Sequence, residues 1–178
     1  RCYDEWDKDN MRQYNFFTSR FFNAFDIELD VKPYLMMVTD VYFAEQTALD
    51  PFSDVIQIIG RFRNGVTSIE HITNVNYDLP QRSEEELCSF MDTSENVYET
   101  LRKFYDAAPN KGAREAYRAA MESLPFNRML DRNGHKNWFA IDNYVNDALV
   151  IGYYHDNKSL HAAYLQHDDI LNALMWVT

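Results

Sequence analysis

The sequence predicts a mainly α protein: a single-domain, multi-helix bundle around a central buried helix, with at most a minor short β element. First, apolar side chains recur at helical spacing along most of the chain. Second, glycine and proline number only 5 each in 178 residues, few for the many turns of an all-β fold. Third, one stretch is apolar around most of its circumference, as expected of a helix that the others surround.

That stretch is residues 33–49, PYLMMVTDVYFAEQTAL. At 100° per residue its apolar side chains face nearly every direction, so we expect a helix buried on most sides. Pro33 suits a first helical turn, and Asp50 with Pro51 marks the start of the next helix. The apolar run is shorter than the about 20 residues that cross a bilayer, so no membrane span is expected.

Two segments precede the central helix. Residues 4–25 carry a broad aromatic stripe at helical spacing and predict a first helix. Residues 25–31 alternate apolar and acidic side chains, which predicts a short half-buried strand. The apolar candidates for its pairing partner are residues 66–75 and 150–154.

After the central stretch, residues 50–63 predict a helix that Asn64 and Gly65 end. Residues 66–75 keep helical spacing through a shorter segment. The chain then reaches a loop around Pro80, the best candidate for an internal boundary. Neither side of this loop alone has a complete core, so we expect one helical domain over residues 1–178.

Helix signals are clearest in the second half. Ser83 and Glu86 have the spacing of a capping box, and Thr93 or Ser94 is expected to cap a second helix that follows it. The further helices are expected over 111–124, as a short turn from Pro125, over 138–149 and over 160–174.

The charge of the chain is unevenly distributed. The net charge is −11, and residues 26–54 contribute −6 of it with seven acidic and one basic residue. Residues 101–136 carry +4, but their charges interleave as on a solvated helix surface. An acidic protein repels nucleic acid in general, so we expect a basic protein partner and no nucleic acid as the primary partner.

Asp26, Glu28 and Asp30 are the candidate partner-binding residues. If residues 25–31 form a half-buried strand, these carboxylates point outward in a row, about 7 Å apart at each step. The same residues begin like a calcium loop, but Val31 and Met37 stand where that loop requires glycine and glutamate. We therefore expect no metal and no cofactor.

No catalytic residue can be assigned from the sequence. None of the five histidines, His71 among them, lies in a metal-binding motif, and no P-loop or nucleophile elbow is present. Asp40 is the most interesting carboxylate because it lies on the predicted central helix. It is expected to pair with Arg61 or Arg63 or to face water, and the alternative is a functional acid in a pocket.

The two cysteines leave the compartment open. Cys2 and Cys88 suit two free thiols in an intracellular protein, or one disulfide in an exported one. A disulfide would favour a secreted or periplasmic protein. Since the chain begins with Arg1 rather than Met, a removed leader or a trimmed chain is expected.

These observations favour a soluble, acidic, single-domain interaction module. The first hypothesis is an inhibitor or immunity-type protein that neutralises a basic protein partner, an analogy of size and charge. The alternative is a helical carrier of an apolar small molecule or lipid, suggested by 7 Met, 12 Phe and 12 Tyr. A hydrolase that uses Asp40 and a histidine ranks below both, so an enzyme is not the first expectation.

Overall fold

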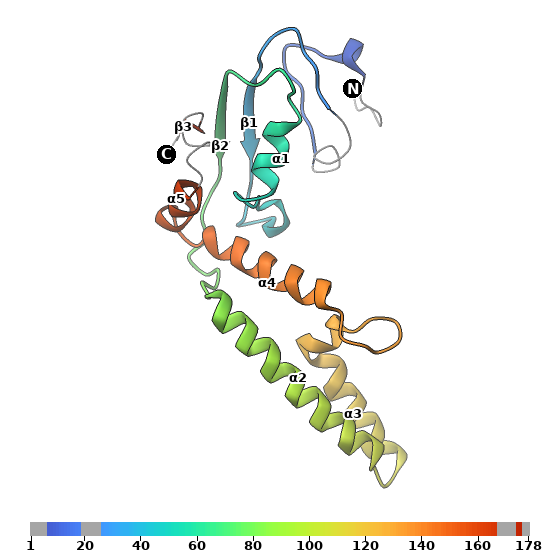
Figure 1. Cartoon of the computed structure of the whole chain (residues 1–178). Helices are drawn as coiled ribbons and strands as arrows, with labels where there is room; N and C mark the ends of the chain where they lie inside the picture. Colours follow the sequence, from blue (N-terminus) through green and yellow to red (C-terminus); the bar gives the residue numbers. More distant parts are fainter. Residues whose placement is uncertain (1–6, 19–25, 167–173, 176–178) are drawn as a thin grey trace. The chain divides into compact units, whose positions relative to one another are not determined.

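The computed structural model describes residues 7–18, 26–166 and 174–175 (Figure 1). The mainly α class is confirmed, since five α-helices accompany three short strands within these residues. The chain divides into two compact units. Unit 1 comprises Arg1–Leu79 with Tyr153–Thr178, and unit 2 is Pro80–Gly152. The single domain expected over 1–178 stays a prediction, because this division does not decide whether the units unfold together.

Unit 1 contains the sheet. Strand β1 (Tyr34–Val38) is followed by helix α1 (Asp54–Gly60) and strand β2 (Ser68–Ile72), and the two strands pair in parallel. Parallel neighbours need such a crossover connection, and here α1 lies within it. Strand β3 (Leu174–Met175) pairs in parallel with the other side of β2, and helix α5 (Asn157–Leu165) completes the unit.

One face of β1 and β2 is buried in the core of unit 1. Met37 and Ile69 are 5% and 1% exposed, and Tyr154 and Tyr164 are fully buried. The buried apolar residues of this unit are Ile27, Met37, Val41, Leu49, Val55, Ile58, Phe62, Ile69, Leu79, Tyr154, Leu160, Ala163 and Tyr164.

The central helix predicted over residues 33–49 is wrong. The segment begins as β1, turns, and continues as the short 3-10 helix η3 (Glu45–Thr47). Burial in β1 alternates, so the true period is two, but apolar residues stand on both faces and hide it. The helical spacing noted over residues 66–75 is also wrong, since their centre is β2.

The described part of the expected first helix is not α-helical. Residues 7–18 contain only the 3-10 turn η1 (Lys8–Asn10), and the Tyr14 and Phe16 side chains are exposed. Residues 4–6 and 19–25 of that prediction lie outside the described residues.

The strand predicted over residues 25–31 is reduced to a single parallel bridge between Ile27 and Phe62. Two backbone bonds make this bridge: Ile27 N–H donates to Arg61 O at 2.7 Å, and Arg63 N–H donates to Ile27 O at 3.1 Å. The pairing partner is therefore neither of the segments expected. The alternation is confirmed over residues 26–30, where Ile27 is buried between the exposed Asp26 and Glu28. It is wrong at Val31, which is 71% exposed, and Phe25 lies outside the described residues.

Helix α1 lies inside the helix predicted over residues 50–63 and is shorter than expected. The Asp50 carboxylate holds the turn before it, accepting from Phe52 N–H at 2.9 Å and Ser53 O–H at 2.7 Å. Beyond the helix, Gly65 has φ of +79°, which glycine adopts without strain. Ile58 is buried, whereas Ile56 is exposed.

Unit 2 is helical in its described residues. Its elements are α2 (Glu84–Asp106), α3 (Lys111–Ser123), the 3-10 helix η4 (Pro125–Met129) and α4 (Trp138–Tyr153), whose last residue belongs to unit 1. Helices α2 and α3 pack against each other (Figure 1). The helices predicted over 111–124 and 138–149 and the turn from Pro125 are confirmed.

The capping box is confirmed as well. Ser83 Oγ accepts from Glu86 N–H at 3.1 Å, and Ser83 N–H donates to a Glu86 carboxylate oxygen at 2.9 Å. The helix break expected at Thr93 or Ser94 is wrong, because α2 is continuous. The Thr93 hydroxyl donates to Ser89 O, and the buried Ser94 hydroxyl accepts from Phe126 N–H, so neither caps a helix.

The core of unit 2 is small. Its buried members are Leu87, Met91, Phe126, Met129, Ile141 and Val145. Of the last expected helix, over 160–174, the first part is confirmed as part of α5, which ends at Leu165. Its end is wrong, because Leu174 belongs to β3, and residues 167–173 lie outside the described residues. No helix in the described part of the chain is long and apolar enough to cross a membrane.

Candidate functional site

The three predicted partner-binding residues are all exposed, but their charges are not equivalent. The Asp26 carboxylate forms ion pairs with Arg63 at 2.8 Å and with Arg61 at 3.6 Å. These are the arginines expected beside Asp40. Asp26 is therefore compensated in part by two arginines of unit 1.

Asp40 follows β1 and holds a turn. One carboxylate oxygen accepts from Asn74 Nδ2 at 2.7 Å and from the backbone N–H groups of Tyr42 and Phe43, each at 3.2 Å. The hydrogen bond from Asn74, followed by that from Phe43, lowers the pKa of Asp40 below its usual value. Asp40 is therefore an ionised, hydrogen-bonded group rather than a proton donor near neutral pH.

A repeated pattern brings polar residues together where β1 and β2 end. Thr39 and Asp40 follow β1, and Thr73 and Asn74 follow β2. Because Val38 is in register with Ile72, each residue of the first pair lies beside its counterpart. We call Thr39, Asp40, His71, Thr73 and Asn74 the strand-end cluster. Open parallel sheets bind ligands at this edge, so the cluster is the position where such a site would lie.

His71 and Thr39 are the buried members of the cluster. The His71 Nδ1 lies 2.7 Å from the Tyr164 hydroxyl, and its Nε2 lies 3.0 Å from the Thr39 hydroxyl. Burial lowers the pKa of His71 to about 4, so the ring is neutral at physiological pH. One histidine therefore joins β1, β2 and α5.

The hydrogen bonds around His71 have a defined direction. The Thr73 hydroxyl donates to Asn74 O at 2.9 Å, and the Thr39 hydroxyl donates to Thr73 Oγ1 at 2.6 Å. Each hydroxyl has only one proton, so Thr39 must accept from His71. The ring proton is consequently on Nε2, and Nδ1 accepts the proton of the Tyr164 hydroxyl.

This arrangement favours a structural role over catalysis. A histidine with a pKa of about 4 is a weak base, and its Nε2 donates to Thr39 instead of accepting its proton. Burial also raises the pKa of Tyr164 and of Tyr154, whose hydroxyl donates to Leu49 O at 2.9 Å. The structure brings Asp40 and a histidine to one edge of the sheet, but Asp40 bonds Asn74.

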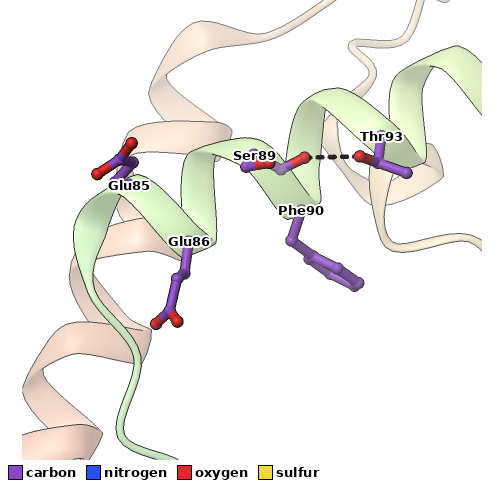
Figure 2. Close-up of a pocket in the computed structure, with 5 residues that line it drawn as sticks. All are labelled: Glu85, Glu86, Ser89, Phe90 and Thr93. Carbon is purple, nitrogen blue, oxygen red and sulfur yellow. Dashed lines mark hydrogen bonds between the residues drawn. The ribbon is translucent and has the colours of Figure 1, made fainter.

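A shallow hollow lies on α2, lined by Glu85, Glu86, Ser89, Phe90 and Thr93 (Figure 2). Its polar groups are used locally: Glu86 completes the capping box, and the Ser89 carbonyl accepts from the Thr93 hydroxyl at 2.8 Å. The Arg82 guanidinium lies 5.5 Å from the centre of the Phe90 ring. These contacts belong to the helix surface and give the hollow no chemistry of its own.

In the basic segment of unit 2, residues 101–136, charged side chains contact other side chains on the helix surface. Lys111 pairs with Glu115 at 3.7 Å, and the Arg114 guanidinium lies over the Tyr105 ring. Among the described residues no cluster of three histidine, cysteine or acidic side chains could hold a metal ion. Cys88 is an exposed free thiol and Cys2 lies outside the described residues, so a disulfide in an exported form stays a prediction.

No family model, curated protein or solved structure matches this chain. The function must therefore be inferred from the sites themselves. Asp26, Glu28 and Asp30 stay predicted partner-binding residues, and sequence reasoning missed the strand-end cluster. The signal was present in two similar runs, Val-Thr-Asp at 38–40 and Ile-Thr-Asn at 72–74, each at the end of an apolar segment.

Proposed function

We propose that the protein is an acidic interaction module that binds and neutralises a basic protein partner, as an inhibitor or immunity-type protein does. The observation that supports this proposal is the alternation around Ile27. Ile27 is buried, and Asp26, Glu28 and Asp30 are exposed at the start of a segment that carries −6 of the net charge of −11.

Exposed carboxylates suit this task because they act at a distance. A negative surface speeds the encounter with a basic protein and makes the association rate depend on salt, without any buried charge. Glu28 is expected to contribute more than Asp26. Asp26 contributes less, since Arg61 and Arg63 already balance it.

The test uses a partner recovered by pulldown from the source organism, with association followed by stopped flow. Changing Asp26, Glu28 and Asp30 to Asn, Gln and Asn should slow association severalfold at low salt and flatten its dependence on ionic strength. Asp26→Asn alone should have a smaller effect than Glu28→Gln with Asp30→Asn.

The matched control is Glu84→Gln with Glu85→Gln, which removes two exposed carboxylates from the first turn of α2 in unit 2. This pair changes the net charge as much as the Glu28 and Asp30 pair. If both pairs slow association equally, only net charge matters and the proposed site is wrong. If the triple variant associates at the wild-type rate in low and high salt, the acidic row is a solvated surface.

A further inference from the structure

Much of the outer face of the sheet in unit 1 is apolar and exposed, as the described residues of β1 and β2 show. On β1, Tyr34, Met36 and Val38 are 77%, 57% and 68% exposed. On β2, Ile72 is in register with Val38 and is also exposed. We call this the sheet face; its members on the two strands are Tyr34, Met36, Val38, Ser68, Glu70 and Ile72.

The two faces of the same strands differ sharply. Met37 is buried beside the exposed Met36, and Ile69 is buried beside the partly exposed Glu70. All-parallel sheets are almost always covered on both faces, usually by helices. Apolar side chains gathered on one exposed face are characteristic of a docking surface.

Charge around the sheet face identifies the kind of occupant. Glu70 is in register with Met36 and lies on the face itself. Glu28 and Asp30 are exposed in the chain directly before β1, and the nearest base in sequence is Lys32. An occupant with basic flanks complements Glu70 on the face and the acidic chain that leads into β1. A second copy of this chain, with its net charge of −11, would place like charges together.

We propose that the sheet face is the docking surface of the interaction module, and that it receives an amphipathic helix of the partner. The apolar stripe of that helix rests on Met36 and Val38, and lysine or arginine on its flank reaches Glu70. This inference rests on the proposed function and adds the place and the form of the contact.

The probe for the experiment is a synthetic helical peptide about 14 residues long, with a leucine stripe flanked by lysines. Two control peptides separate the contributions. One has the same composition in a scrambled order, and the other has glutamate in place of lysine. Binding is measured by fluorescence anisotropy and located by the ε-methyl NMR signals of methionine.

Met36 and Met37 provide an internal control, because they are adjacent in sequence but 57% and 5% exposed. The Met36 methyl signal should shift and saturate with the lysine peptide, while the Met37 signal stays nearly constant. The scrambled and glutamate peptides should bind at least about tenfold more weakly, a loss equal to one or two apolar or charged contacts.

The variant is Met36→Thr with Val38→Thr, which keeps β-forming residues on the exposed side of β1. It should weaken binding of the lysine peptide about tenfold. Phe139→Ala is the control, since it removes an 81% exposed aromatic ring from α4 in unit 2. Unchanged melting of the threonine variant shows that the fold is intact.

The outcomes distinguish the two proposals. One result would overturn the docking surface alone. In that result, binding is salt-sensitive and is abolished by Glu28→Gln with Asp30→Asn, but the threonine variant binds as the wild type does. Equal binding of the lysine and glutamate peptides would overturn the proposed function and the basic occupant with it. Binding that leaves the Met36 signal unmoved, or a dimer that the threonine variant disrupts, would also overturn this inference.

Discussion

Within unit 1 and within unit 2, the contacts that define the elements differ in how far apart in sequence their residues lie. In unit 2 the elements are long helices, and the bonds that delimit them are local, as between Ser83 and Glu86. In unit 1 the elements are short and the decisive bonds join distant residues. Thr39 and Thr73 are 34 positions apart, and His71 and Tyr164 are 93 apart.

The difference shows which part of the fold each kind of signal specifies. A capping residue and a helical stripe act within a few residues and define an element on their own. A strand gains its stability from the strand beside it, so its identity depends on the partner. The starts of α2 and α3 in unit 2 therefore follow local rules, whereas the strands of unit 1 depend on how its segments meet.

The largest expected effect tests whether this contrast extends to unfolding. Leu87→Ala truncates a side chain that is 1% exposed in the core of unit 2, and should lower the free energy of unfolding by about 2–5 kcal/mol. We predict one cooperative transition, because the small core of unit 2 makes it marginal alone. Hydrogen exchange should then accelerate in both units.

Ile69→Ala is the matching change in unit 1, at another side chain that is 1% exposed. Leu165→Ala, at a 48% exposed site on α5, is the control and should change little. If Leu87→Ala accelerates exchange only between residues 80 and 152, the units unfold separately and the single domain expected from the sequence is wrong.

The sequence identified unit 2 well because its signals are local. The capping box at Ser83, the stripe over 111–124 and Pro125 each specify structure within a few residues. The error at Thr93 has the same origin. Threonine resembles a cap in sequence, but within a continuous helix its hydroxyl can donate to the carbonyl four residues earlier, as it does here.

The sequence did not identify β1, and the reason is physical. Both of its faces carry apolar residues, Met36 outside and Met37 inside, so a strand and a buried helix share one pattern. Only the pairing with β2 distinguishes them. An outer face that is apolar enough to confuse the pattern is also the face for which we propose a partner.

The candidate sites were predictable to different degrees. Alternation along residues 26–30 was sufficient to place Asp26, Glu28 and Asp30 outside. The pairing of Asp26 with Arg63 was not predictable, because it depends on the bridge between Ile27 and Phe62. The strand-end cluster likewise exists only through the register of β1 and β2.

A smaller expected effect is the pH dependence of the free energy of unfolding, which His71 in unit 1 should cause. In the folded protein burial holds the pKa of His71 at about 4, below the usual 6.5. Between these values the unfolded chain binds a proton that the folded chain does not, so stability falls as pH falls through this window. From pH 7 to pH 5 this histidine should cost about 2 kcal/mol of the free energy of unfolding.

Urea unfolding at pH 7 and pH 5 measures the effect, and NMR of the histidine rings assigns it. The His71 ring should show no titration above pH 5. A His71 ring that titrates near 6.5 would contradict both its burial and the hydrogen bonds assigned to it.

The smallest expected effect tests the local rules of unit 2. Ser83→Ala removes the cap of α2 and should lower the free energy of unfolding by about 1 kcal/mol. Thr93→Ala should cost only a few tenths of a kcal/mol at most, because the Thr93 hydroxyl bonds a carbonyl that the helix already uses. Both sites are exposed and both changes remove a hydroxyl, so urea unfolding compares them directly. Equal costs would mean that a helix begins near Thr93 after all, and that local signals in unit 2 are as ambiguous as those in unit 1.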